Sequence, residues 1–272
     1  MSIVTLTTDL GYRDHYLAIV KAGLISKVKD LQIIDLSCEI RNNNISDAAY
    51  VLRNALPHFP ENSIHLVGIK FVQEKSMLNN QREIDNSRYL ITKYQNQYIL
   101  SPDNGLFSLI DAGFKEKVYQ IYYSGEHKRH FFMKDVFVDA AVHLLENKAL
   151  EDIASPTEEY YKATRFESYL QGNILRGKAI YVDDFGNLIT NLKKDVFEKA
   201  VGKKNFSITF PGKHITKISQ TYDDVKHGAL VVFFNSSDHL EVAINGGSAY
   251  SLLCPKELGM AFDFNLMVEI HD

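Results

Sequence analysis

A carboxylate stands at the end of the first β-rich segment of the chain. Residues 3–8 are rich in β-branched side chains, and Asp9 follows them directly within the run TTDLG. Open parallel sheets bind ligands at the carboxyl ends of their strands, and a carboxylate there can accept hydrogen bonds from both hydroxyls of a ribose. Asp9 is therefore a candidate ligand-binding residue, with an N-cap of the following helix as the alternative. Asp14 has the same two interpretations, with the cap favoured.

The second half of the chain carries three short motifs of small polar residues and glycine beside apolar segments. They are DDFGN at 183–187, NSS at 235–237 and NGGS at 245–248. Asparagine side chains and exposed backbone amides suit the recognition of a planar heterocycle and a small zwitterion. Each motif alone is also ordinary turn chemistry, so the argument depends on the three together.

Other motifs are rejected. The run GNILRGK at 172–178 matches most of a P-loop, but Ala179 stands where magnesium needs Ser or Thr, and a strand follows in place of a helix. The DFG of 184–186 lacks the accompanying kinase motifs. His127 and His130 enclose Lys128 and Arg129, which would repel a cation, so we expect a solvated loop and no metal site.

Composition excludes several classes of protein. With 45% apolar and 24% charged residues, the 272-residue chain can build a packed core. Its net charge of −4 argues against a nucleic-acid partner. Two distant cysteines favour reduced thiols, and the sequence has neither a signal-like start nor an apolar run of membrane-spanning length. We therefore expect a cytoplasmic location and no membrane contact.

The elements that must position these residues begin with repeated strand–helix–strand units, which imply a parallel sheet. We expect strands at 3–8, 31–36 and 63–71. Between them lie a helix with Leu17, Val20, Leu24, Ile25 and Val28 inward and a helix capped by Ser46 and ended by Pro60. A polar loop at 73–87 precedes a hairpin at 89–93 and 97–100. A turn at 102–105, helices at 106–112 and 133–150, and a strand at 117–123 follow.

Beyond about residue 170 the chain becomes a series of short strands. We expect them at 178–182, 188–191, 206–210, 230–234 and 239–244, with one helix at 194–201. A boundary within 165–172 then gives an α/β nucleoside-binding domain of residues 1–168 with a mainly parallel sheet. The second domain, residues 169–272, is smaller, mostly antiparallel β and barrel-like.

The motifs, taken in order, resemble the S-adenosylmethionine hydroxide adenosyltransferase family, formerly a domain of unknown function, which includes hydrolases, fluorinases and chlorinases. The resemblance covers essentially the whole chain and is specific as a set. It rests on TTDLG with Asp14, PDNG at 102–105, KDVF at 134–137, DFGN with Thr190 and Asn191, and Asn235-Ser236 with Asn245.

The resemblance implies a homotrimer with each site between two subunits. In the family, a nucleophile attacks the ribose C5′ of S-adenosylmethionine and displaces methionine. The sulfonium is already a good leaving group, so no metal or other cofactor is implied, and catalysis is mainly positioning and electrostatics. The resemblance assigns Asp9 to the ribose hydroxyls, Asn187 and Asn245 to the adenine edge, and Asp183 and Ser236 to the methionine amino and carboxylate groups. Phe185, Asp14 and Asn43 join them as ligand-binding residues.

The chain departs from the family hydrolases where they prepare the attacking water. Lys70 occupies the position of their Asp, and Phe132 the position of their His. A protonated lysine only donates hydrogen bonds, whereas a carboxylate orients or deprotonates water. His130 lies two residues before Phe132, on the same face if that segment is a strand, and is a candidate replacement. Arg88, or Arg82, is the candidate for the family's arginine. Asn43 aligns with the tryptophan of the halogenases, and the chain contains no Trp, which argues against fluorination.

Three functions follow from this pattern. The first is hydrolysis of S-adenosylmethionine to adenosine and L-methionine, provided that the altered water site is competent. The second is a catalytically impaired protein that binds S-adenosylmethionine or adenosine. The third is an enzyme with the same site architecture that acts on another adenosyl compound.

Overall fold

The computed structural model describes residues 2–69, 88–122, 131–210, 212–254 and 264–271. The chain forms two compact units, Met1–Arg165 and Phe166–Asp272. Lys70, His127, His130, Arg82 and the loop at 73–87 lie outside the described residues.

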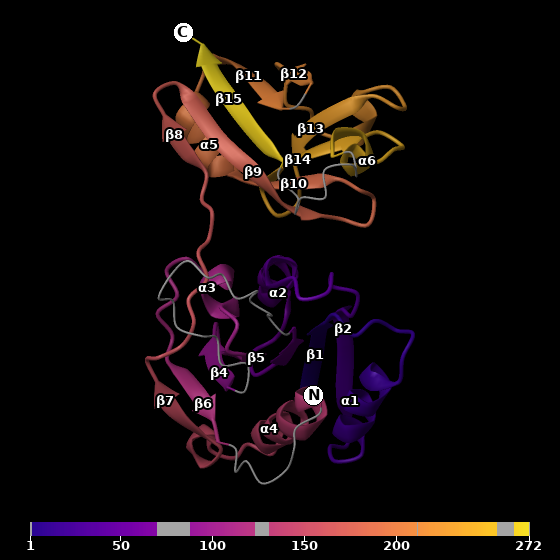
Figure 1. The fold of residues 1–272 in the computed structure, drawn as a ribbon, viewed down its shortest axis with the longest axis vertical. Helices are drawn as coiled ribbons and strands as arrows, with labels where there is room; N and C mark the ends of the chain where they lie inside the picture. The colour runs from indigo at the N-terminus through magenta and orange to yellow at the C-terminus, as the bar shows by residue number, and fades with distance from the viewer. Residues whose placement is uncertain (1, 70–87, 123–130, 211, 255–263, 272) are drawn as a thin grey trace, which may run out of the picture. The chain divides into compact units, whose positions relative to one another are not determined.

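The N-terminal unit is built on a mixed sheet of order β2-β1-β3-β5-β4-β6-β7 (Figure 1). Its parallel part consists of β1 (Ser2–Thr8), β2 (Leu31–Ser37), β3 (Ile64–Gly68) and β5 (Gln97–Pro102). The antiparallel part consists of β4 (Tyr89–Tyr94), β6 (Val118–Ile121) and β7 (Ala154–Thr157). The expected strands and the hairpin of β4 and β5 are confirmed, and β7 is an addition.

Helices cover both faces of this sheet. One core packs α1 (Tyr16–Ile25) and α4 (Val138–Leu145), with the π-helical turn η2 (Met133–Phe137) before it, against side chains such as Val4 and Leu66. The other core packs α2 (Ile45–Ala55) and α3 (Leu106–Ile110) against Val67 and Ile99. The short helices η1 (Leu56–His58) and η3 (Leu150–Asp152) lie in connections. The unit is thus a three-layer α/β structure.

Three expectations about these helices are wrong, one of them being the helix at 133–150, which ends at Leu145 with α4. Asn44, not Ser46, caps α2, because its side-chain oxygen accepts a hydrogen bond from the backbone amide of Asp47 at 3.0 Å. Ile25 is 60% exposed and Val28 lies beyond the helix, because α1 ends at Ile25 and its inward positions are Leu17, Val20 and Leu24.

A buried polar ladder crosses three parallel strands. The Thr5 hydroxyl of β1 lies 2.7 Å from Nδ1 of His65 in β3, and Nε2 of His65 lies 2.7 Å from Oε1 of Gln97 in β5. The Gln97 amide nitrogen donates to the carbonyls of Leu56 and Phe59, so its oxygen must face His65. His65 therefore donates from Nε2 and accepts at Nδ1 from Thr5. Burial lowers the pKa of His65 to about 4.

The C-terminal unit is an antiparallel, nearly closed, barrel-like sheet of order β12-β11-β15-β9-β10-β14-β13, with β8 paired to β9. Its strands are β8 (Tyr169–Gln171), β9 (Ile174–Val182), β10 (Leu188–Lys193), β11 (Asn205–Phe210), β12 (Lys213–Ile215), β13 (Leu230–Phe234), β14 (His239–Ile244) and β15 (Asn265–His271). The helices are α5 (Lys194–Val201), α6 (Ala249–Leu253) and the short η4 (Tyr222–Asp224). The expected strands and the helix at 194–201 are confirmed, while β8, β12, β15 and α6 were not anticipated.

Candidate functional site

Asp9 lies where the loops after β1 and β2 meet. Its Oδ2 accepts a hydrogen bond from the backbone amide of Asn43 at 2.9 Å. The backbone amide of Ile40 donates to the Thr8 carbonyl at 3.1 Å and that of Gly11 to the Cys38 carbonyl at 2.7 Å, so the two loops are joined on both sides of the carboxylate. The structure thus brings the predicted residues Asp9 and Asn43 together at the carboxyl edge of the parallel strands. The carboxylate holds the chain just before α2, and a cap of α1 by Asp9 is not what the structure shows.

Asp14 is exposed, and the N-cap position of α1 is taken by His15, which has no side-chain cap hydrogen bond. Asp14 is therefore not the N-cap of α1. Asn43 adopts a left-handed backbone with φ of 59° and is exposed. Asparagine tolerates that conformation better than most residues, which fits its place in the tight turn before α2.

The turn at 102–105 holds two neighbouring segments. Asn104 is buried, and its amide nitrogen donates to the Ile69 carbonyl after β3 at 2.9 Å. Asp103 is also buried; its backbone amide donates to the Arg88 carbonyl at 3.0 Å, and its Oδ2 lies 3.4 Å from Nη1 of Arg88. The PDNG motif therefore holds both Ile69 and Arg88, the residues that precede and follow 70–87.

Arg88 has further partners in its own unit. Its guanidinium donates to Oε1 of Gln120 at 3.2 Å, to the Thr157 hydroxyl at 3.4 Å and to the Glu159 carbonyl. Its structural role is therefore evident, and its catalytic role stays a prediction.

Phe132, which the sequence analysis aligns with the histidine of the family hydrolases, is packed into the core of the N-terminal unit. Its ring stacks on Tyr89 at 5.3 Å and meets Phe137 edge-on at 5.3 Å. Phe132 has helical backbone angles (φ −59°, ψ −32°) at the start of η2. The prediction that His130 and Phe132 lie on the same face assumes a strand. Phe132 is helical, so that assumption does not hold at Phe132.

In the C-terminal unit, the motifs at 183–187 and 245–248 line one pocket. Its volume is about 470 Å³, and Phe185, Asn187, Tyr222, Ile244, Asn245, Gly246 and Gly247 line it. The first motif is bonded to the residues that follow the second, because the backbone amide of Tyr250 donates to the Gly186 carbonyl at 2.8 Å. Gly186 has φ of 79°, and a Cβ there would lie 2.1 Å from the Ser248 hydroxyl oxygen. We call this cavity the asparagine pocket.

The pocket's asparagines are held by hydrogen bonds. Asn187 donates from Nδ2 to Oδ2 of Asp183 at 2.9 Å and to the Tyr222 hydroxyl at 3.1 Å. Oδ1 of Asp183 accepts the backbone amides of Phe185 and Asn187, which shapes the turn. Asn245 donates from Nδ2 to the Val225 carbonyl at 2.9 Å. The pocket is therefore preorganised, and the Phe185 ring, 77% exposed, stands at its rim.

The network continues to residues that the sequence analysis missed. The Tyr222 hydroxyl donates to Oε1 of Glu241 at 2.6 Å, and Asn235 donates from Nδ2 to Oε2 at 3.1 Å. Burial raises the pKa of Glu241, against the effect of these two hydrogen bonds. Burial and the Glu241 contact raise the pKa of Tyr222. A carboxylate inside the apolar run LEVAI was the available signal for Glu241.

Ser236 lies apart from the pocket lining. It is exposed in the turn between β13 and β14, whereas Asn245 follows the far end of β14. Asn235 holds that turn, since its Oδ1 accepts the backbone amides of Ser237 and His239. The predicted residues thus occupy both ends of one hairpin.

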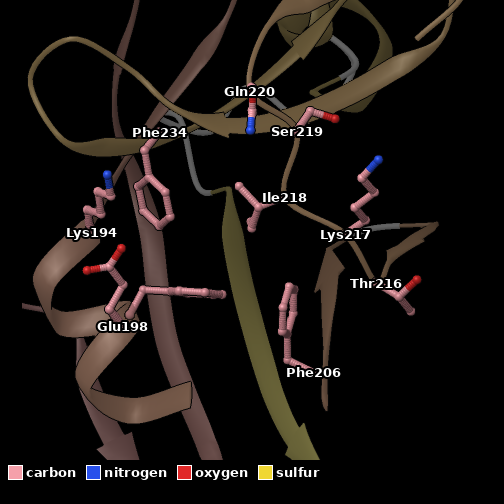
Figure 2. A pocket seen from close by; sticks show the side chains of 10 residues that line it. Lys194, Glu198, Phe206, Thr216, Lys217, Ile218, Ser219, Gln220 and Phe234 are labelled. Carbon is pink, nitrogen blue, oxygen red and sulfur yellow. The ribbon is translucent and has the colours of Figure 1, made fainter. Parts of the chain in front are cut away.

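A second cavity of about 640 Å³ contains none of the predicted residues. Phe206, Phe234 and Ile218 form part of its apolar lining, with Lys194 and Glu198 of α5 on one side and Lys217 on the other (Figure 2). It is larger than the asparagine pocket but lacks that pocket's hydrogen-bonded amides. Within the described residues, no group of His, Cys, Asp and Glu could hold a metal ion, and no helix is both long and apolar enough to span a bilayer.

Comparison with known proteins decides the family. The model of the SAM hydroxide adenosyltransferase N-terminal domain matches residues 4–154, and that of the C-terminal domain matches residues 177–258. The chain belongs to the SAM hydroxide adenosyltransferase family. Together the two models cover both structural units, so the family assignment applies to the α/β unit and to the barrel-like unit alike.

Relatives within this family carry an activity in their names. An (R)-S-adenosyl-L-methionine hydrolase of Methanocaldococcus jannaschii is 29% identical over 201 residues, 72% of this chain and 68% of its own. One from Thermus thermophilus is 27% identical over 94% of this chain and 97% of its own. The fold agrees with that of an uncharacterized conserved protein from Thermotoga maritima, with a TM-score of 0.81, 24% identity, and coverage of 98% and 99% of the two chains.

Proposed function

We propose that the protein hydrolyses S-adenosylmethionine to adenosine and L-methionine. The family assignment and the names of its relatives support this, and the asparagine pocket is the single structural observation that carries it. In that pocket Asn187 and Asn245 present rigidly held amides to a heterocycle, and Phe185 offers an aromatic face. Asp183, whose carboxylate also shapes the turn, and Ser236 would meet the methionine amino and carboxylate groups.

The proposed ribose ligand is Asp9. Its Oδ2 already accepts the Asn43 amide, which fixes the carboxylate and leaves Oδ1 for the ribose hydroxyls. In the proposed reaction, the water oxygen bonds to C5′ while the C5′–S bond breaks, with its electron pair going to sulfur and one water proton released. Methionine leaves readily because its departure neutralises the sulfonium charge. Positioning of the water and the ligand therefore supplies most of the catalysis. We assign the positioning of the attacking water to Lys70, His130 and Arg88. Asp14 and Asn43 would lie beside the ligand. We propose that the protein is a homotrimer in the cytoplasm.

The test is incubation of the purified full-length protein with the (R) and (S) sulfonium epimers in H₂¹⁸O. We expect adenosine and methionine from the (R) epimer, with ¹⁸O in the adenosine 5′-hydroxyl. Adenosine formed no faster than in a buffer blank would overturn hydrolysis. Labelled homoserine formed together with methylthioadenosine would place the attack at the methionine Cγ and overturn attack at C5′.

A second function is favoured by Phe132. Its buried ring takes the place of an imidazole and cannot exchange a proton with water. A protein that binds S-adenosylmethionine without cleaving it would show heat in calorimetry with S-adenosylmethionine or adenosine and no product. No heat with either compound would exclude this function.

The variant Lys70→Asp separates the two functions. A carboxylate restores the group that family hydrolases carry, and general acid–base catalysis contributes about 10² or more to rates. We expect turnover to rise at least about tenfold with little change in KM. Lys29→Asp is the control for the change of charge and should leave turnover unaltered. An unchanged rate in Lys70→Asp would contradict the assignment of the water site to this position.

A further inference from the structure

With Glu241 ionised, the polar network behind the asparagine pocket has one direction of donation. Oδ1 of Asn235 accepts two backbone amides, so its Nδ2 must face Glu241. Glu241 then receives donors on both oxygens, as an ionised carboxylate does, and one of those donors is the Tyr222 hydroxyl at 2.6 Å. Having donated its only hydrogen, the Tyr222 hydroxyl can only accept from Asn187.

The other end of the network is fixed in the same way. The Asp183 carboxylate accepts hydrogen bonds and does not donate, and it lies 2.9 Å from Nδ2 of Asn187. Two acceptors, Asp183 and Tyr222, therefore take both amide hydrogens of Asn187. Asn187 is 2% exposed and lines the pocket, so the group that it has left for a ligand is its carbonyl oxygen.

We infer that Tyr222 and Glu241 are positioning residues that hold the Asn187 carbonyl toward the ligand, so that the asparagine pocket selects a purine with a 6-amino group over one with a 6-oxo group. This rests on the proposed function, because it takes the ligand to be a nucleoside bound through Asn187. An amino group donates to the fixed carbonyl. An oxo group meets it acceptor to acceptor, and sites built for a hydrogen bond discriminate strongly against ligands that cannot make it.

This selectivity also depends on a residue that does not line the pocket. Glu241 is 4% exposed, within β14, and does not line the pocket. The Tyr222 ring is held by an edge-on contact with Phe233 at 4.7 Å, so its hydroxyl has little freedom to turn away. In Glu241→Gln, an amide hydrogen can be donated to the Tyr222 oxygen, which frees the tyrosine hydrogen and removes one of the two constraints on Asn187, the other being Asp183.

The experiment compares adenosine with inosine, which differ at position 6, by calorimetry on the full-length protein. We expect wild type to bind adenosine at least about tenfold more tightly than inosine. Tyr222→Phe and Glu241→Gln should each reduce that ratio at least about threefold, because one neutral hydrogen bond is lost or reversed. Tyr169→Phe removes a hydroxyl from an exposed tyrosine outside the pocket and should leave the ratio unchanged.

The ratio separates positioning from a merely structural role, which would weaken both nucleosides equally. Equal binding of adenosine and inosine by wild type, or an unchanged ratio in Tyr222→Phe, overturns the inference while the proposed function stands. If thermal melting shows that Glu241→Gln does not fold, Tyr222→Phe alone decides. Failure of wild type to bind either nucleoside overturns the proposed function, and this inference with it.

Discussion

The two candidate regions are held in different ways. At the edge of the N-terminal sheet, Asp9 is positioned by backbone: it ends a parallel strand, and its partner is the amide of Asn43. In the asparagine pocket, position depends on a series of side chains, from Asp183 through Asn187 and Tyr222 to Glu241. The first arrangement follows from topology. The second depends on contacts between side chains, so a substitution outside the pocket lining, such as one at Glu241, should also disturb it.

The largest effect is expected at Asp9. Asp9→Ala removes the carboxylate proposed to bind two ribose hydroxyls and also the anchor of Asn43. Hydrogen bonds to a charged group contribute about 1.5–3 kcal/mol each, so affinity for adenosine should fall more than about 100-fold in calorimetry. Asp139→Ala, at an exposed carboxylate of α4, is the control and should bind normally. Unchanged affinity in Asp9→Ala would refute the ribose role.

The next effect is on stability, in Gly186→Ala. A left-handed backbone costs a non-glycine residue about 1–2 kcal/mol, and the new Cβ would also clash with Ser248. We expect a loss of about 2–4 kcal/mol in the free energy of unfolding, measured with denaturant. Gly172→Ala has a similar φ with nothing within 4 Å, so it should show the backbone cost alone. Equal losses in the two variants would show that the motifs are not in contact.

The pH dependence of the free energy of unfolding tests the burial of His65 in the N-terminal unit. The His65 pKa of about 4 lies below the usual value of 6.5, so the unfolded chain takes up the proton first as pH falls. The stability from neutral His65 is complete above pH 6.5 and declines toward pH 4. Between pH 7 and pH 5 wild type should lose about 2 kcal/mol more than His65→Gln, measured by denaturant unfolding. A parallel loss in both proteins would contradict this.

The smallest effect is expected at Ser236. The residue is exposed in a turn held by Asn235, so Ser236→Ala should change the free energy of unfolding by less than about 0.5 kcal/mol. If the hydroxyl meets the methionine carboxylate, affinity for S-adenosylmethionine should fall about three- to tenfold, while affinity for adenosine stays the same. A loss for both ligands would place Ser236 near the nucleoside instead.

The contrast between the two regions also explains which features could be predicted from the sequence. Hydrophobic periodicity and turn residues predicted the parallel strands, and hence Asp9 at their carboxyl edge, because both are local signals. The cap of α2 was misplaced by two residues, since several polar residues precede that helix and only geometry distinguishes Asn44 from Ser46. Tyr222 and Glu241 were not predicted, because their roles arise from a side-chain contact between η4 and β14 that the sequence does not show.

The strands that were missed differ in how much signal their sequences carry. In β15 the buried residues Leu266, Val268 and Ile270 alternate with exposed ones, a period-two signal. The sequence just before it, at 255–263, contains Pro255 and Gly259, so turn signals also preceded this strand and it could have been predicted. The first strand of a β-hairpin as short as β8, with three exposed residues, carries almost no hydrophobic signal at all.

The ladder of Thr5, His65 and Gln97 has a consequence for strand pairing itself. Side chains alternate between the two faces of a sheet, so a slip of β3 by one residue against β1 or β5 would turn His65 away from both partners. The apolar neighbours Ile64 and Leu66 would tolerate such a slip far better, since both faces of this sheet are covered by helices and accept aliphatic side chains. The three polar residues therefore favour one register of the strands, whose carboxyl ends lead to Asp9 and to the PDNG turn.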